Sequence, residues 1–491
     1  MYKYSGKILQ RVDSIHKNYN NSKLNTELYI IEPGYILNKD AYKIWRFLDE
    51  EIVYDDLFEK IKAIFNIKNN KMLNEKLEKI LDSFYERALI KVDRKVITFN
   101  NIINTSYFDE DDFINSFKVR PITQVDLVLT NKCNFRCKHC FIKSENLKGT
   151  TTIDIDSWKK ALLSLSRFGL FSINITGGEP LTYSGIEEII DYAELLGLRV
   201  QLLTNAYLIN EEFVKKLSKY NNIIVQVSID GSNQETYERQ RGLTGSFNKC
   251  IRNVELLIAN GVDVVVAMVL NKYNINDIYD ESMVNLCKKI GVKYLVLTPN
   301  VIEFSSAIDN SEMFLNAEEA YNVVKYINNK NKVNAYGDIT VNVSVPPALT
   351  DENSLSLIRK ERPRCRRGTN SFSIRPNGNV YICTDFAELG YKDYYLGNIL
   401  YDDITTIIEK LNPIVKNKKD NLSKIKGVCS ICKELKYCWG ACRAYAFAKY
   451  GDLNAPYPFC QNLYELGLFP ENKIDKSIKY LEFNEVNDGG R

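Results

Sequence analysis

The sequence predicts an α/β protein in which a parallel sheet is flanked by a smaller domain on each side. From about residue 121 to 300, strand-sized apolar runs alternate with amphipathic helical patterns. About 105 residues without cysteine lead the chain, and seven of its twelve cysteines lie between Cys365 and Cys460. Parallel strands need crossover connections, so the alternation fits a doubly wound sheet or an incomplete β/α barrel. In both, ligands collect at the C-terminal ends of the strands.

Residues 1–105 predict a small winged-helix-like domain that ends in an acidic linker. Its expected elements are a strand at 27–31, helices at 40–48, 54–67 and 72–89, and a two-stranded wing at 90–99. A DNA-binding winged helix is the alternative. The second predicted helix carries Asp55, Asp56 and Glu59 where groove binding would favour Lys and Arg, so this alternative is poorly supported.

The central region predicts six strands and five helices between them. The expected strands lie at 125–129, 172–175, 199–203, 223–229, 262–269 and 293–297. The expected helices lie at 154–166, 185–196, 210–220, 246–260 and 276–290. Polar motifs follow the strands, which places the expected site at their C-terminal ends.

Charge and hydropathy disfavour several classes of protein. In the 491 residues, 65 Lys and Arg against 62 Asp and Glu leave a net charge of +3, so no basic field indicates a nucleic-acid partner. No apolar run approaches the ~20 residues that span a bilayer, and the first residues do not resemble a signal peptide. We therefore expect a soluble cytoplasmic protein with reduced cysteines. With only two histidines, metal ligation would fall to sulfur.

The first cysteine motif, CxxxCxxC, directly follows the first predicted strand and comprises Cys133, Cys137 and Cys140. Three thiolates at one centre suit a cubane iron-sulfur cluster that leaves one iron open. A structural zinc site wants four ligands. A zinc knuckle completed by His139 or by a distant cysteine is the less favoured alternative.

The second cysteine group lies in the C-terminal part of the chain and comprises Cys365, Cys383, Cys429, Cys432, Cys438, Cys442 and Cys460. A turn signal at residues 375–379 predicts a hairpin that brings Cys365 and Cys383 onto adjoining elements. A zinc ribbon over residues 429–442 is the alternative to iron-sulfur clusters. Cys250 and Cys287 fall in predicted helices and are expected to be ordinary buried cysteines.

CxxxCxxC after the first strand of a β/α domain is similar to the motif of the radical S-adenosylmethionine (SAM) enzymes. Later motifs strengthen this resemblance: GGEP after the second strand, Thr-Asn after the third, and SIDG with a following Arg-Gly after the fourth. The resemblance implies a partial (β/α)6 TIM-type barrel and SAM contacts from Gly177, Gly178, Glu179, Pro180, Thr204, Asn205, Ser228 and Arg241. Two glycines would let the backbone approach the ligand, and the GGEP carboxylate would accept from the SAM ammonium.

The resemblance also implies a reaction and its reductant. One electron from the reduced cluster cleaves SAM to methionine and a 5'-deoxyadenosyl radical, which abstracts a hydrogen atom from the substrate. The cofactor performs the difficult step, while the protein orients and shields it. The electron would come from a flavodoxin or ferredoxin.

The seven C-terminal cysteines resemble the SPASM extension of radical SAM proteins, which holds two auxiliary [4Fe-4S] clusters. By that pattern, one cluster is held completely by Cys429, Cys432, Cys438 and Cys460. The other takes Cys365, Cys383 and Cys442 and is one protein ligand short, so we hypothesise that its open iron binds a substrate thiolate. With the SAM cluster, three cubanes are expected. Asp385, just beyond Cys383, is a candidate general base, although most such aspartates are merely solvated.

The N-terminal block resembles the precursor-recognition (PqqD-like) domain of enzymes that modify ribosomally made peptides, in which a leader peptide adds as a strand to a sheet edge. The resemblance divides the chain into a recognition domain (1–105), a radical SAM core (120–345), a SPASM domain (346–470) and a tail (471–491). We expect a peptide maturase that forms cysteine thioethers. The alternatives are carbon-carbon or carbon-oxygen crosslinking, formylglycine formation, and a non-enzymatic iron-sulfur electron carrier.

Overall fold

The chain divides into two compact units, Met1–Pro121 and Ile122–Arg491. In the second unit the computed structural model describes residues 122–142, 152–166, 168, 170–220, 222–299, 312–350 and 368–483. In the first it describes residues 8–11, 16–21, 26–31, 35–38, 44, 48, 52–64, 70–86 and 90–92. The finer division into four segments stays a prediction.

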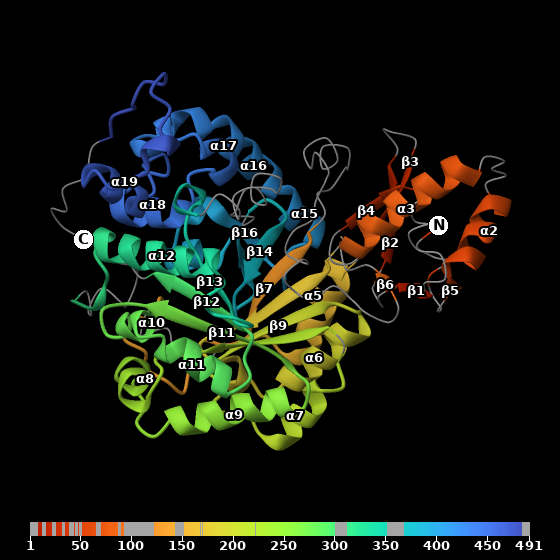
Figure 1. Cartoon of the computed structure of the whole chain (residues 1–491), viewed down its shortest axis with the longest axis horizontal. Coiled ribbons are helices and arrows are strands. Elements are labelled where there is room, and N and C mark those ends of the chain that lie inside the picture. Colours follow the sequence, from red (N-terminus) through yellow and green to blue (C-terminus); the bar gives the residue numbers. More distant parts are fainter. Residues whose placement is uncertain are drawn as a thin grey trace. The chain divides into compact units, whose positions relative to one another are not determined.

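A ten-stranded sheet forms the centre of the second unit (Figure 1). In spatial order its strands are β13 (Thr340–Val343), β12 (Tyr294–Pro299), β11 (Asp263–Leu270), β10 (Ile223–Ser228), β9 (Arg199–Thr204), β8 (Ser172–Thr176), β7 (Gln124–Val128), β14 (Ser371–Ile374), β15 (Asn379–Tyr381) and β16 (Tyr395–Asn398). Strands β7 to β13 are all parallel to their neighbours. The sheet is open, with β13 and β16 at its edges, which agrees with the expected α/β fold and with an incomplete barrel.

Helices connect the parallel strands (Figure 1). They are α5 (Ile155–Ser166), α6 (Ile186–Leu195), α7 (Glu211–Leu217), α8 (Gln234–Arg241), α9 (Phe247–Ala259), α10 (Asn276–Tyr279), α11 (Ser282–Lys289) and α12 (Ala317–Lys332). In α5, Trp158, Leu162 and Leu165 share one face and are fully buried. Asn316 caps α12 in a capping box with Glu319, which satisfies backbone groups that the first helical turn leaves free.

Six predicted strands and four of the five predicted helices are confirmed to within a few residues, and three features were missed. The helix expected at 276–290 is interrupted at Glu281, whose φ of 60° is left-handed, so α10 and α11 are separate. Helix α8 lies where only a motif was noted, and its polar sequence gives little apolar periodicity. Strand β13 continues the parallel sheet beyond the predicted six.

The C-terminal part of the chain joins the same sheet. Strand β14 pairs in parallel with β7, the strand that leads into the first cysteine motif, and forms the predicted hairpin with β15. The helices that follow are α14 (Thr384–Glu388), α15 (Ile404–Glu409), α16 (Leu411–Asp420), α17 (Leu435–Cys438), α18 (Arg443–Tyr450) and α19 (Pro458–Glu465). A buried ion pair of 2.5 Å between Arg375 and Glu388 ties the hairpin to α14. Cys383, which directly precedes α14, is thereby attached to the central sheet.

Among its described residues, the N-terminal unit contains two small antiparallel sheets and two helices. One sheet has the order β5 (Ile52–Val53), β1 (Ile8–Arg11), β6 (Ile90–Val92); the other has β2 (His16–Asn21), β3 (Thr26–Ile31), β4 (Tyr35–Asn38). Helices α2 (Tyr54–Ile64) and α3 (Asn70–Glu86) confirm two expected helices. Of the helix expected at 40–48 only residues 44 and 48 are described, and the second strand of the expected wing lies outside the described residues. The winged-helix arrangement therefore stays a prediction.

None of the helices in the described part of the chain combines the length and the apolar character that crossing a membrane requires.

Gly378 fixes the turn of the β14–β15 hairpin. Its φ is +86°, and a Cβ atom there would lie 2.6 Å from the Asn398 side-chain oxygen. Gly390 has a similar φ of +64°, but a Cβ atom there would meet nothing within 4 Å. We expect Gly378→Ala to lower the free energy of unfolding by more than the ~1 kcal/mol that a left-handed alanine costs. Gly390→Ala should show only that conformational cost. Thermal denaturation of both variants checks this, and equal melting temperatures would contradict it.

Candidate active site with three sets of cysteines

The first three cysteines lie on the loop that follows β7, at the C-terminal end of the parallel strands. Burial is the main cause that raises the pKa of the Cys133 thiol to about 11 and that of Cys140 to about 12. Burial also raises the pKa of Cys137. Only the thiolate form binds a metal, so a bound cation would have to stabilise that form against the effect of burial.

The backbone of Gly178 and Glu179 holds this cysteine loop in place. Gly178 donates its N–H to the Thr130 carbonyl, and Glu179 donates to the Lys132 carbonyl, both at 2.8 Å. A Cβ atom on Gly177 would lie 2.5 Å from the Thr130 carbonyl oxygen, and one on Gly178 would lie 2.4 Å from that of Lys132. We had expected these glycines to admit a ligand. The described contacts give another reason, because only glycine lets the two loops pack this closely.

The Glu179 side chain is buried and accepts three hydrogen bonds. They come from the Thr204 hydroxyl at 2.6 Å, from the Asn205 backbone at 2.8 Å and from the Leu181 backbone at 3.2 Å. Burial raises the pKa of this carboxyl to about 7, while the hydrogen bonds lower it. The predicted residues of the second and third strand ends thus meet at one carboxylate, with the buried Pro180 starting the short 3-10 turn after it.

Two further contacts attach the cysteine loop to later strand ends. The Asn205 side-chain amide donates to the Asn134 side-chain oxygen at 2.8 Å. Lys138 donates its backbone N–H to the Gln240 carbonyl at 2.9 Å, at the end of α8. Ser228, the last residue of β10, is half-buried, and no hydrogen bond from its side chain to this loop is among the described contacts. Of the residues expected to contact SAM, Ser228 is therefore the one that the structure does not tie to the others.

A buried charged group not identified from the sequence lies beside the first cysteine motif. Asp230 is 2.7 Å from the Arg241 Nε atom and 3.1 Å from the His139 Nε2 atom. Burial raises the pKa of Asp230, but Arg241 and His139 outweigh it and lower the pKa to about 2. Arg241 also donates to the Cys137 sulfur at 3.5 Å. The His139 Nε2 atom is therefore engaged with Asp230, which disfavours the zinc knuckle, and Arg241 is engaged with Asp230 and Cys137. Asp230 lies in the SIDG motif, which is the feature of the sequence from which this buried group could have been identified.

Four of the C-terminal cysteines line one cavity. They are Cys429, Cys432, Cys438 and Cys460, and Tyr457 and Phe469 complete the wall. Within the described ranges, no three Cys, His, Asp or Glu side chains are placed to hold a single metal ion. A cubane contains four metal ions and so spaces its ligands more widely than one zinc ion does. The four cysteines that line this cavity are those that the resemblance to the SPASM extension assigns to one cluster.

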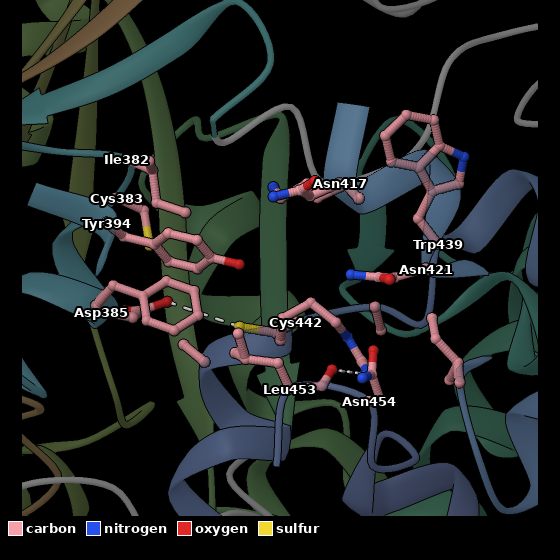
Figure 2. A pocket seen from close by; sticks show the side chains of 16 residues that line it. Ile382, Cys383, Asp385, Tyr394, Asn417, Asn421, Trp439, Cys442, Leu453 and Asn454 are labelled. Atoms are coloured by element: carbon pink, nitrogen blue, oxygen red, sulfur yellow. Dashed lines mark hydrogen bonds between the residues drawn. The ribbon is translucent and has the colours of Figure 1, made fainter. Parts of the chain in front are cut away.

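Cys383 and Cys442 line a second cavity of about 90 Å³, together with Asp385 (Figure 2). The Cys442 thiol donates to a carboxylate oxygen of Asp385, with 3.9 Å between sulfur and oxygen. Cys365, the third cysteine expected here, lies outside the described residues. Two of the three cysteines predicted for this cluster, Cys383 and Cys442, thus line one cavity with Asp385, the predicted general base.

A three-residue linker separates the two cavities. Cys438 lines one and Cys442 the other, and Ala441 lines both. Trp439, Gly440 and Ala441 all have positive φ values, of 54°, 75° and 56°. Left-handed backbone at a non-glycine residue costs about 1 kcal/mol or more and persists at sites that require it. Here it turns the chain so that the two cysteines face different cavities.

Cys250 and Cys287 are fully buried, as predicted. The Cys250 sulfur accepts a hydrogen bond of 3.2 Å from the Tyr237 hydroxyl.

We expect Gly178→Ala to remove the first cluster site selectively. The added methyl group would overlap the Lys132 carbonyl and push away the cysteine loop, while the C-terminal cavities stay intact. Iron and sulfide analysis of reconstituted protein should show the loss of about four irons per chain. Gly261→Ala, where a Cβ atom would meet nothing within 4 Å, is the control and should keep all of its iron.

Asp230→Asn is expected to destabilise the protein by about 3–5 kcal/mol, because it leaves the Arg241 and His139 side chains buried without their anionic partner. Asp191→Asn is the matched control, since the exposed ion pair between Asp191 and Lys216 should contribute at most about 1 kcal/mol. Equal melting temperatures for the two variants would show that the buried group is not a stabilising pair.

Comparison with known proteins identifies two domains in the chain. Residues 127–282 match the radical SAM superfamily, and residues 365–434 match the SPASM iron-sulfur cluster-binding domain. The chain is 27% identical over 380 residues, 77% of each chain, to the antilisterial bacteriocin subtilosin biosynthesis protein AlbA of Bacillus subtilis. It is 28% identical over 352 residues to the AdoMet-dependent heme synthase of Methanosarcina barkeri, covering 68% of this chain and 94% of that protein. For the mycofactocin maturase MftC of Mycolicibacterium smegmatis the identity is 27% over 336 residues, covering 68% and 81%.

Solved structures share the fold. Streptococcus suis SuiB bound to S-adenosylmethionine superposes with a TM-score of 0.63 at 16% identity, covering 92% of this chain and all of SuiB. The enzyme anSMEcpe with bound AdoMet gives a TM-score of 0.54 at 20% identity, covering 71% and 93%. These matches show that the chain contains a radical SAM domain over residues 127–282 and a SPASM iron-sulfur cluster-binding domain over residues 365–434.

Proposed function

We propose that this enzyme modifies a ribosomally made precursor peptide. The observation that carries the proposal is the combination, in one compact unit, of the CxxxCxxC loop with two further cavities lined by cysteines. Relatives in sequence include AlbA and MftC, named for the biosynthesis of a bacteriocin and for the maturation of mycofactocin. SuiB is known in complex with its precursor peptide SuiA.

The proposed cofactors are SAM and three [4Fe-4S] clusters. Cys133, Cys137 and Cys140 would hold the cluster that, when reduced, supplies the electron for SAM cleavage. The loops that carry Glu179, Thr204, Asn205 and Arg241 fix the position of these cysteines through the contacts described above. The protein's own contribution is thus to hold the cysteine loop rigidly at the strand ends.

We propose cysteine thioether formation as the reaction. The Cys383 and Cys442 cavity, with Cys365 added by sequence pattern, offers three thiolates, one fewer than a cubane has irons. An iron without a cysteine of the enzyme suits a thiolate from the substrate. Carbon-carbon and carbon-oxygen crosslinks contain no cysteine sulfur, so neither product would need a substrate thiolate at this iron.

The N-terminal unit is proposed to bind the leader of the precursor. In its described residues β2 and β4 are the outer strands of a three-stranded antiparallel sheet, and an outer strand can pair with an added peptide strand. We further propose a cytoplasmic enzyme reduced by a flavodoxin or ferredoxin, with neither nucleic acid nor membrane as a partner.

Two measurements test the function. Reconstituted protein reduced with dithionite should contain about twelve irons per chain and should release 5'-deoxyadenosine from SAM. Coexpression with a small cysteine-rich precursor should remove the mass of two hydrogen atoms per bond, and fragmentation should locate each bond at a cysteine sulfur.

The control is the Cys133→Ala variant, which should lose SAM cleavage and peptide modification while it keeps the auxiliary clusters. Failure of fully reconstituted protein to release 5'-deoxyadenosine would sink the radical mechanism. Crosslinks that leave every cysteine sulfur unmodified would overturn the thioether assignment.

A further inference from the structure

A buried arginine contacts both an aspartate and a sulfur of the first cysteine motif. The Arg241 guanidinium forms an ion pair of 2.7 Å from its Nε atom to Asp230 and donates a hydrogen bond of 3.5 Å from an Nη atom to the Cys137 sulfur. Arg241 and Asp230 are both more than nine-tenths buried. Because charges inside a protein are screened much less than charges at its surface, this guanidinium acts strongly on the sulfur beside it.

The position of Asp230 is fixed by hydrogen bonds to its side chain and to its backbone. The side chain accepts from the Val269 backbone N–H at 2.7 Å. The backbone carbonyl accepts from the Gln240 side-chain amide at 2.7 Å and from that of Asn274 at 3.1 Å. Gln240 and Asn274 are themselves fully buried. The ion pair with this carboxylate therefore holds the Arg241 guanidinium in one place.

The backbone on both sides of Cys137 is bonded to the same end of α8. Arg136 donates its N–H to the Arg241 carbonyl at 3.3 Å, and Lys138 donates to the Gln240 carbonyl at 2.9 Å. These two bonds join the segment that carries the guanidinium to the segment that carries the sulfur. The contact between donor and sulfur is thus set by main-chain structure rather than by a long side chain alone.

A hydrogen bond from a cation to a ligand sulfur affects one redox state of a cluster more than the other. A cluster becomes more negative by one unit charge when it is reduced, so a cationic donor stabilises the reduced form more than the oxidised form. The potentials of iron-sulfur clusters depend on net charge, on hydrogen bonds to the sulfurs and on solvent exposure. The Arg241 contact supplies the first two of these influences at Cys137.

We propose that Arg241 sets the reduction potential of the cluster held by Cys133, Cys137 and Cys140 through its hydrogen bond to the Cys137 sulfur, which makes the cluster easier to reduce. The proposal rests on the proposed cluster but not on a peptide substrate. The electron comes from the external reductant, Arg241 keeps its protons, and no bond is made or broken. The sequence predicts that Arg241 contacts SAM, whereas the role proposed here needs no SAM.

The test compares the parent protein with a double variant that combines Asp230→Asn and Arg241→Gln. The glutamine amide nitrogen stands at the same place along the side chain as the arginine Nε atom, so it can still donate to residue 230 but cannot reach the Cys137 sulfur. The two changes keep the net charge and leave no unpaired buried charge. The matched control combines Asp191→Asn and Lys216→Gln, the same kind of change at an exposed ion pair of 2.7 Å.

The first measurement is a redox titration without SAM. Each full-length protein is reconstituted with iron and sulfide and reduced stepwise with dithionite, while EPR records the reduced clusters. A variant with alanine at positions 133, 137 and 140 supplies the auxiliary-cluster signal to be subtracted. At the parent's midpoint potential, the double variant should show a ratio of reduced to oxidised first cluster about tenfold lower, equal to a shift of about 59 mV to more negative values. The control should match the parent.

The second measurement detects the hydrogen bond in the unsubstituted protein. The parent is labelled with ¹⁵N-arginine, and its reduced first cluster should show a ¹⁵N hyperfine coupling in HYSCORE spectra, because a hydrogen bond to a ligand sulfur transfers spin density to the donor nitrogen. The double variant labelled in the same way should lose this coupling, and the control should keep it.

Equal midpoint potentials for the parent and the double variant would overturn the proposal, as would an equal shift in the control. If the double variant does not bind the first cluster, the labelled parent decides, since a ¹⁵N coupling supports the hydrogen bond and its absence overturns it. A parent protein without the EPR signal of the first cluster would instead contradict the proposed cofactors. The two failures are therefore distinguishable, and neither depends on peptide modification.

Discussion

The contacts between the cysteine loop and the neighbouring strand ends determine the rest of the site. Backbone groups of Thr130 and Lys132 accept hydrogen bonds from Gly178 and Glu179, while Lys138 donates to the end of α8. These bonds join segments that are far apart in sequence, and they form only when parallel strands bring the segments to one edge of the sheet. The strand order therefore sets the cysteine positions more than the loop's own sequence does.

Buried charge adds a second constraint at the same place. The carboxylate of Asp230 neutralises the positive charge of Arg241, and Arg241 in turn donates a hydrogen bond to the Cys137 sulfur. A cationic group beside a thiolate ligand stabilises added negative charge, which favours a reduced cluster. Strand β14 lies directly beside β7 and so connects this region to the C-terminal part of the chain, which contains the other cysteines. The radical SAM core and the cysteine-rich extension are thus parts of one sheet.

The sequence was sufficient where the signal is local. Apolar runs located β7 to β12, and the resemblance to the SPASM extension grouped the four cysteines that line a common cavity. Prediction from the sequence failed where the role of a residue depends on tertiary contacts. Glycines 177 and 178 are required by the carbonyls of a distant loop, and His139 pairs with an aspartate that lies about ninety residues away. The continuity of the sheet across β14 was likewise missed, because the sequence of a four-residue strand does not indicate which strand it pairs with.

The left-handed linker at residues 439–441 has a consequence for electron transfer. Tunnelling rates fall steeply with distance, and in many multicentre proteins that distance changes when domains move. Here Cys438 and Cys442 lie on the same short covalent span, whose conformation is fixed at each residue. The gap between the two auxiliary centres would stay constant however the substrate or the N-terminal unit moves. The rate of electron exchange between the two auxiliary centres would therefore not depend on conformational changes elsewhere in the protein.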